Sequence, residues 1–64
     1  MSLKKYYNQV VLVEPINGNN FIGIVEDYFE PDDNESGTES IIIKKSDDSL
    51  TEIYPQDIDK ITVL

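Results

Sequence analysis

The sequence predicts an all-β fold: a small barrel of five strands with a 3₁₀ turn before the last strand. Apolar and β-branched residues gather in short runs, which is typical of strands. Turn-forming residues separate these runs, most clearly at Asn17-Gly18, a strong hairpin signal. No segment repeats apolar residues at helical spacing over a useful length. Five short strands joined by tight turns describe a small all-β barrel.

The elements follow in order along the chain. Residues 3–9 show no clear period and predict either a short helical turn or an extended lead-in. Apolar runs predict five strands, at residues 9–14, 21–29, 39–45, 50–54 and 58–64. Pro15 breaks the ladder after the first strand because it lacks an N–H. Residues 30–38 form an acidic loop, and Pro55-Gln56-Asp57 predicts a single 3₁₀ turn.

Gly23 interrupts the longest strand-like run, residues 21–29. Glycine inside a strand often marks a sharp bend or bulge at a barrel corner. We therefore expect this strand to bend and to serve both halves of the barrel. The alternative is a glycine tolerated at an exposed edge.

The predicted strands carry apolar residues on both faces, although a strand in a one-layer barrel should alternate. The expected core comprises Val11, Val13, Phe21, Val25, Ile41, Ile43, Ile53, Ile61 and Val63. The residues expected to point outward are Val10, Leu12, Ile22, Ile24 and Ile42. Exposed together, they would form an aggregation-prone patch. Either the lead-in residues Leu3, Tyr6 and Tyr7 fold back over them, or another copy of the chain covers them.

We favour a homo-oligomer whose interface comprises these five residues, because self-association supplements a thin core. The alternative is that the inward and outward assignment is wrong and that the lead-in segment suffices. The 64 residues form one domain, residues 1–64, in which residues 1–8 are the lead-in and residues 30–38 the acidic loop.

The composition argues against several classes of function. Thirteen Asp and Glu against five Lys give a net charge of −8, and there is no arginine. Affinity for nucleic acid comes largely from Lys and Arg, and anionic membranes repel negative charge, so we expect neither partner. With no cysteine and no histidine, the chain lacks a thiolate and the usual general base. We find no catalytic constellation and expect a non-enzymatic protein with no cofactor.

The location follows from the apolar runs. None approaches the roughly 20 apolar residues of a membrane span. Residues 10–13 are too few for a signal peptide's apolar region of about 7–15 residues. We therefore expect a cytoplasmic protein.

Residues 26–39 concentrate negative charge without a basic residue. The seven carboxylates are Glu26, Asp27, Glu30, Asp32, Asp33, Glu35 and Glu39. Asp32, Asn34 and Ser36 match the first half of a calcium loop, which supplies oxygen ligands, but Ile43 stands where the bidentate Glu belongs. We expect no metal, and these three residues are the only candidates. The alternatives are a solvated loop held open by its own repulsion, or a surface for a basic partner protein.

Val11-x-Val13, Asn17-Gly18 and Phe21-x-Gly23-x-Val25 together resemble the first motif of the Sm-like proteins, a branch of the SH3-like small barrels. Residues 53–64, a strand, a proline-containing turn and a strand, are similar to the close of that fold. The resemblance implies an SH3-like (Sm-like) barrel. RNA-binding Sm-like proteins carry Asp-x-x-x-Asn and Ile-Arg-Gly-like signatures. Here residues 27–34 break the first spacing, and residues 53–56 contain no arginine.

Three hypotheses follow. The first is a non-enzymatic structural or protein-interaction module that self-associates. The second is an Sm-like RNA-binding protein with a degenerate site, which requires a basic patch built from Lys4, Lys5, Lys44, Lys45 and Lys60. The third is cation binding by the acidic loop. Tyr54-Pro55 also resembles one wall of the peptide groove of SH3 domains, but that groove needs a tryptophan and the chain has none.

Overall fold

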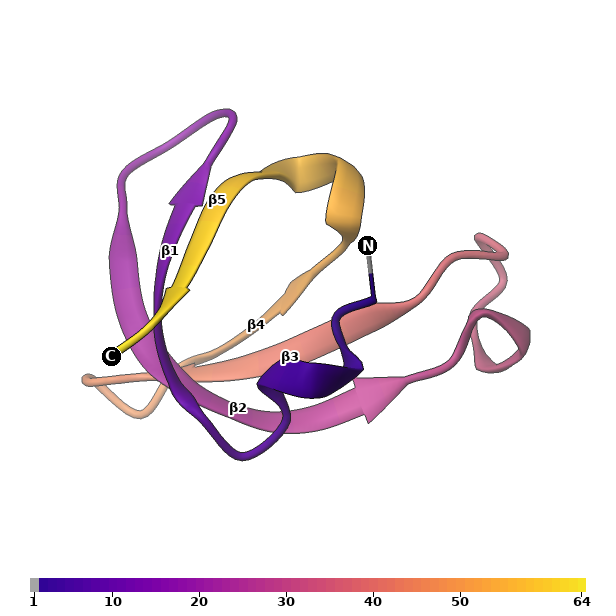
Figure 1. The fold of residues 1–64 in the computed structure, drawn as a ribbon, viewed down its shortest axis with the longest axis horizontal. Helices are drawn as coiled ribbons and strands as arrows, with labels where there is room; N and C mark the ends of the chain where they lie inside the picture. Colours follow the sequence, from indigo (N-terminus) through magenta and orange to yellow (C-terminus); the bar gives the residue numbers. More distant parts are fainter. Residues whose placement is uncertain (1) are drawn as a thin grey trace.

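The computed structural model describes residues 2–64, which form one antiparallel five-stranded sheet (Figure 1). The strands are β1 (Val10–Pro15), β2 (Phe21–Phe29), β3 (Ser40–Lys45), β4 (Leu50–Ile53) and β5 (Ile58–Val63). Three 3₁₀ turns are η1 (Lys4–Tyr6), η2 (Pro31–Asp33) and η3 (Pro55–Asp57). The all-β class, the five strands and the turn before the last strand are confirmed. The lead-in forms a 3₁₀ turn and is not extended.

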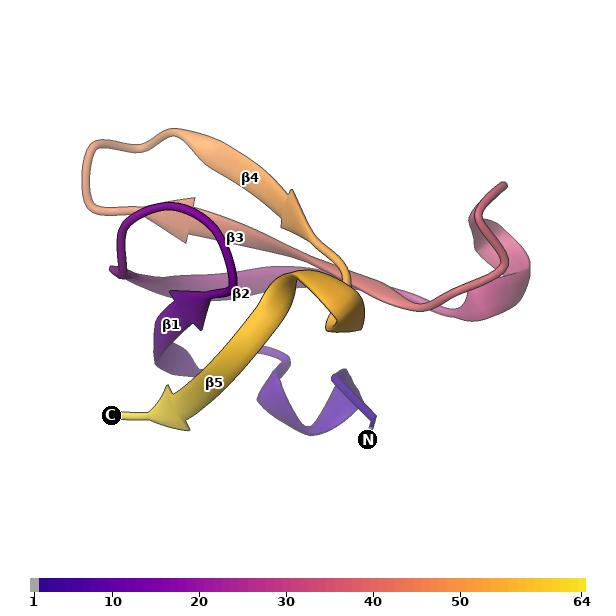
Figure 2. The same ribbon diagram turned by 90° about the horizontal axis from the view of Figure 1, so that it is seen from above.

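The strand order is β4-β3-β2-β1-β5, so β4 and β5 are the two edges of the sheet. The sheet curls strongly, and η3 joins its two edge strands (Figures 1 and 2). Within residues 2–64 no ladder connects β4 with β5. The hydrogen bonding therefore shows an open, curled sheet, and closure into a barrel stays a prediction.

The bend lies in β2, as Gly23 predicts. Gly23 is buried, and a Cβ atom built there would lie 2.5 Å from Ile43 Cγ2 and 2.5 Å from the Lys44 carbonyl oxygen. The register with β3 shifts between Val25 and Asp27, which makes Glu26 the extra residue of a bulge. A bulge bends its strand and increases the local twist. The exposed-edge alternative is therefore wrong: Gly23 lets β3 approach closely where the sheet curls.

The core lies on the concave face of the sheet. It comprises Leu3, Tyr6, Val11, Val13, Val25, Ile41, Ile43, Ile53 and Ile58, with Phe21, Tyr28 and Ile61 packed against it. The predicted core is thus correct except at Val63, whose exposed fraction is 47%. Val63 does pair with the buried Val11, but it is the last residue of an edge strand and no strand lies beyond it.

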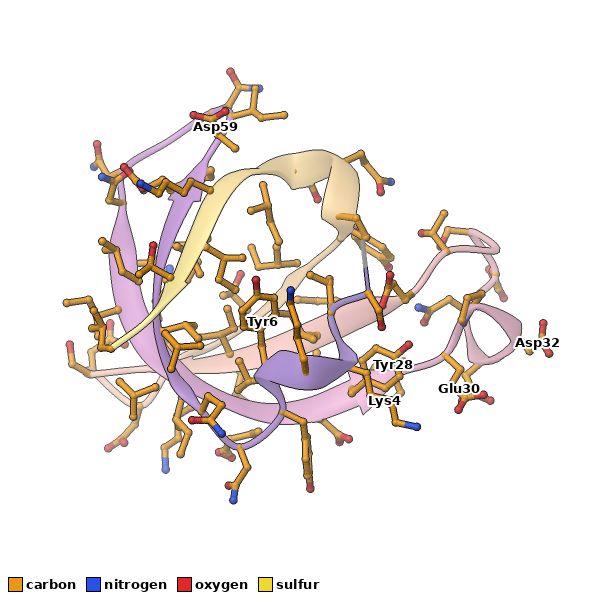
Figure 3. The ribbon with its side chains drawn as sticks, viewed as in Figure 1. Lys4, Tyr6, Tyr28, Glu30, Asp32 and Asp59 are labelled. Carbon is orange, nitrogen blue, oxygen red and sulfur yellow. The ribbon has the colours of Figure 1, made fainter. Side chains whose placement is uncertain are left out.

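The lead-in segment supplies two buried core residues that the sequence did not predict, and Ile58 at the start of β5 is the third. Leu3 is fully buried, and its backbone N–H donates to Glu39 Oε1 at 2.7 Å. The ring of Tyr6 is also buried, and Figure 3 shows it pointing into the concave side of the sheet. The radius of gyration of 10.8 Å is close to the value of about 10.7 Å expected for a compact chain of this length. The lead-in therefore covers the concave face.

Candidate interaction surface

Four of the five residues predicted to form an oligomer interface lie together on the convex face of β1 and β2. Val10 pairs with Ile24, and Leu12 pairs with Ile22. Directly paired side chains have their Cβ atoms only about 5 Å apart, so the four form one block, which we call the outer patch. Val10 and Ile22 are 45% and 51% exposed, and the other two are half-buried.

Two further apolar side chains extend the row that contains Val10 and Ile24. Lys44 pairs with Ile24 on one side and with Leu50 on the other, and the Leu64 N–H donates to the Val10 carbonyl. Leu50 and Leu64 are 63% and 64% exposed. The row therefore crosses β4, β3, β2 and β1 on the convex face and ends at Leu64, the residue that follows β5. Strand alternation counted back from the buried Ile53 would have predicted that Leu50 points outward. The position of Leu64 could not be predicted in this way, because it depends on the register between β5 and β1.

Ile42, the fifth predicted interface residue, lies apart from the outer patch. It is half-buried, and its cross-strand partners are Asp27 on β2 and Glu52 on β4. β2 continues past Val25 with Glu26 and Asp27, so an acidic residue pairs with Ile42 where an apolar one would have continued the block. Ile42 is thus bordered by carboxylates on both sides.

The outer patch is not covered by the lead-in segment. Leu3 and Tyr6 are buried in the core on the concave face, and Tyr7 is 53% exposed. The sequence analysis kept two alternatives for what covers these residues, the lead-in segment or a second copy of the chain. The first of these is wrong for the described residues.

The charges near the outer patch are few and balanced. Lys44 Nζ lies 3.5 Å from Asp48 Oδ1, the one ion pair of residues 2–64. The ammonium of Lys45 lies over the ring of Phe21, 4.5 Å from its centre. Ser49 donates from its backbone N–H and its hydroxyl to Asp47, which lowers the pKa of that carboxyl. The seven-carboxylate segment instead ends in the loop at the far end of the molecule (Figure 2).

The three calcium candidates are spread along this acidic loop. Asp32 lies in η2 and points away from the sheet (Figure 3). The Asn34 side-chain amide donates to the Thr38 carbonyl at 2.8 Å and to Ser40 Oγ at 3.0 Å, and the Ser36 hydroxyl bonds that of Thr38. Asn34 and Ser36 therefore bond within the loop and to the start of β3. Residues 2–64 contain no group of three or more Asp, Glu, Cys or His side chains arranged to hold a metal ion.

The lysines required for an RNA surface lie on three separate elements. Lys4 and Lys5 are in η1, Lys44 and Lys45 end β3, and Lys60 is on β5 opposite Glu14. Three of them already interact within the chain, Lys44 with Asp48, Lys45 with the ring of Phe21 and Lys5 with the ring of Tyr6. The lysines therefore lie in separate small groups and do not form the continuous basic surface that RNA binding requires.

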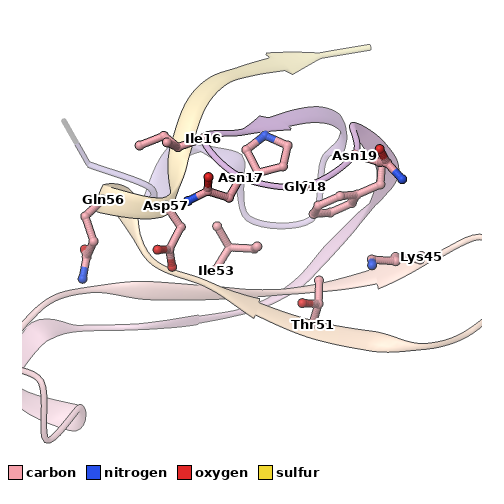
Figure 4. A pocket seen from close by; sticks show the side chains of 11 residues that line it. Ile16, Asn17, Gly18, Asn19, Lys45, Thr51, Ile53, Gln56 and Asp57 are labelled. Carbon is pink, nitrogen blue, oxygen red and sulfur yellow. The ribbon is translucent and has the colours of Figure 1, made fainter.

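A cavity of about 410 Å³ lies between β4, the β1–β2 loop and η3 (Figure 4). Its floor includes Thr51 and Ile53 of β4 together with Phe21, and polar side chains at the rim include Asn17 and Asp57. No local sequence pattern predicts this cavity, because it forms where the edge strands diverge.

Two tyrosines half-buried at strand ends have raised pKa values. Burial raises the pKa of Tyr28, and its hydrogen bond to Glu39 raises it further. Burial also raises the pKa of Tyr54, with the negative charges of Glu52 and Asp57 adding to the effect. These shifts do not change the protonation state near pH 7, because the ordinary pKa of a tyrosine is about 10. Both neutral phenols suit packing and hydrogen bonding.

No helix among residues 2–64 has the length and apolar character needed to cross a membrane. Compared with known proteins, the chain matches no protein-family model, no curated protein and no solved structure.

Proposed function

We propose that this chain is a non-enzymatic protein-interaction module that self-associates through the outer patch. The observation that carries the proposal is the block formed by Val10, Leu12, Ile22 and Ile24, which is apolar, contiguous and uncovered. Burying apolar surface contributes about 25 cal/mol per Å², so a face of this kind favours a partner over water.

A second copy of the chain suits the outer patch for an electrostatic reason. Each copy carries a net charge of −8, so association must keep the acidic segments apart. The acidic loop lies at the opposite end of the molecule from the β3–β4 turn, which borders the patch (Figure 2). Beside the patch, Lys44 and Lys45 accompany Asp47 and Asp48, so two copies meeting there would bring cations close to carboxylates.

The order of elements supports an SH3-like (Sm-like) barrel as the fold of the module. Five antiparallel strands, a bent second strand and a 3₁₀ turn between the last two strands are the features on which the resemblance rests. Because one fold serves many functions, the proposed function depends on the outer patch and not on the fold.

Sedimentation velocity at increasing concentration, from about 5 µM to about 1 mM, tests the proposal. The wild-type chain should sediment with a mass above the 7.3 kDa of one copy. Ile22→Asp should weaken association by roughly a hundredfold, because it removes about 2–3 kcal/mol of apolar burial and adds a charge.

Ile16→Asp is the matched control, since Ile16 is 61% exposed but lies in the β1–β2 loop away from the outer patch. It makes the same chemical change and should leave the sedimenting mass unchanged. A wild-type chain that stays a monomer at every concentration, or two variants that lose association equally, would overturn the proposal.

A further inference from the structure

The outer edge of β4 presents unpaired main-chain groups. The Lys45 N–H donates to the Ser49 carbonyl, and the pairs Ile43 with Thr51 and Ile41 with Ile53 continue that register. Hydrogen-bonded pairs alternate along an antiparallel ladder. Thr51 and Ile53 therefore bond to β3, and the N–H and C=O groups of Leu50 and Glu52 point away from it. Within residues 2–64 no strand pairs with this edge.

The cavity described above lies on the concave side of the same strand. Thr51 and Ile53 point from β4 toward the β1–β2 loop, and Asp57 points into the same space (Figure 4). Side chains of a strand alternate between the two faces. A strand added beside β4 would thus place every second side chain toward this cavity, and the others beside Glu52 on the convex face.

The chain that follows β3 around this edge is acidic, while at the end of β3 Lys44 pairs with Leu50 and Lys45 lines the cavity. Residues 46–59 contain five carboxylates and no basic residue: Asp47, Asp48, Glu52, Asp57 and Asp59. Glu52 also lies beside the half-buried ring of Tyr54, so an aromatic ring and a carboxylate stand together at the end of the strand. A carboxylate next to an aromatic ring favours a lysine or arginine side chain.

We propose that the free edge of β4 binds an extended segment of a basic partner protein by β-strand addition. The main chain of the segment pairs with Leu50 and Glu52. Its basic side chains lie beside Glu52, and its alternate, apolar side chains point toward the cavity above Ile53. A second copy of this chain suits the edge less well, because its net charge of −8 would be repelled by the carboxylates at the edge.

The test is an NMR titration of the ¹⁵N-labelled full chain with a capped peptide of alternating lysine and valine. The amide signals of Leu50 and Glu52 should shift and exchange with solvent more slowly, because added hydrogen bonds protect them. A peptide of alternating glutamate and valine should bind at least tenfold more weakly. A lysine–valine peptide with alternate N-methylated amides should not bind, since it cannot complete the ladder.

Variants separate the main-chain contact from the charge. Leu50→Pro removes the outward N–H without breaking a ladder bond, and it should abolish binding, whereas Leu50→Ala should keep it. Glu52→Gln should weaken binding about two- to fivefold, the size of an exposed charge pair, while Glu26→Gln at the distant bulge should not. Unchanged amide spectra confirm that each variant folds.

Four results would overturn the proposal, of which three concern the edge itself. They are no shift at millimolar peptide, equal binding of the glutamate peptide, or protection of Leu50 and Glu52 that depends on protein concentration without peptide. The last result would assign the edge to a second copy of the chain. Shifts confined to the outer patch would likewise show that the peptide binds elsewhere.

Discussion

Gly23→Ala is the substitution whose effect follows most directly from the structure. The added methyl carbon would lie 2.5 Å from both Ile43 Cγ2 and the Lys44 carbonyl oxygen, well inside van der Waals contact. The Ile43 side chain could shift, but it is fully buried in the core. The carbonyl of Lys44 belongs to the β2–β3 ladder and cannot move without disturbing the pairing with Ile24.

We expect Gly23→Ala to lower the free energy of unfolding by about 3 kcal/mol, the upper part of the range for overpacking. The total for a chain of this length is only about 3–10 kcal/mol. With a urea m-value of about 1 kcal/mol/M, the unfolding midpoint should fall by about 3 M, or the variant should not fold. Circular dichroism during urea denaturation measures this directly, with every variant at one protein concentration, because association would stabilise the folded state.

Gly18→Ala is the control, because it makes the same change where the added methyl meets nothing within 4 Å. Its cost should be about 1 kcal/mol and should come only from the positive φ of 98°. If Gly23→Ala unfolded within about 0.5 kcal/mol of the wild-type chain, the close approach of β2 and β3 would be wrong.

Three further predictions test other parts of the molecule. Leu3→Ala should lower the unfolding free energy by about 2–5 kcal/mol in urea denaturation, because Leu3 is fully buried, whereas the exposed Leu50→Ala should change it little. Ser49→Ala should raise the pKa of Asp47 in an NMR titration. Because the pKa of Asp47 is lowered in the folded state, the ionised carboxylate stabilises the fold at pH values above the ordinary Asp pKa of about 3.9, and this stabilisation is lost as the pH falls through the folded-state pKa. An unchanged pKa of Asp47 in the variant would contradict the hydrogen-bond assignment. Ile42→Asp should disturb association less than Ile22→Asp in sedimentation, since Ile42 lies between two carboxylates, and equal effects would place the interface across β3 as well.

The sequence predicted the strands well because their signals are local. β-branched runs and turn residues placed all five strands to within one residue at each end. Gly23 marked the bend for a steric reason that the structure bears out. The lead-in was harder to predict, because Leu3 and Tyr6 are buried only through contacts with strands far along the chain.

The candidate surfaces divide in the same way. Strand alternation was enough to predict Val10, Leu12, Ile22 and Ile24, because their exposure follows from the pleat. Strand alternation also grouped Ile42 with them, but alternation alone does not show which residues pair across strands, and Ile42 pairs with Asp27 and Glu52. The cavity and the free edge of β4 depend on how far the sheet curls, which no local pattern specifies.

Intermolecular contacts between methyl groups would test self-association most directly. Equal amounts of ¹³C-labelled and unlabelled chain would be mixed, and isotope-filtered nuclear Overhauser spectra recorded at millimolar concentration. We expect cross-peaks that join the methyl groups of Val10, Leu12, Ile22 and Ile24 in one copy to protons of the other. A spectrum without such cross-peaks, from a sample that tumbles as a single 7.3 kDa chain, would contradict the account.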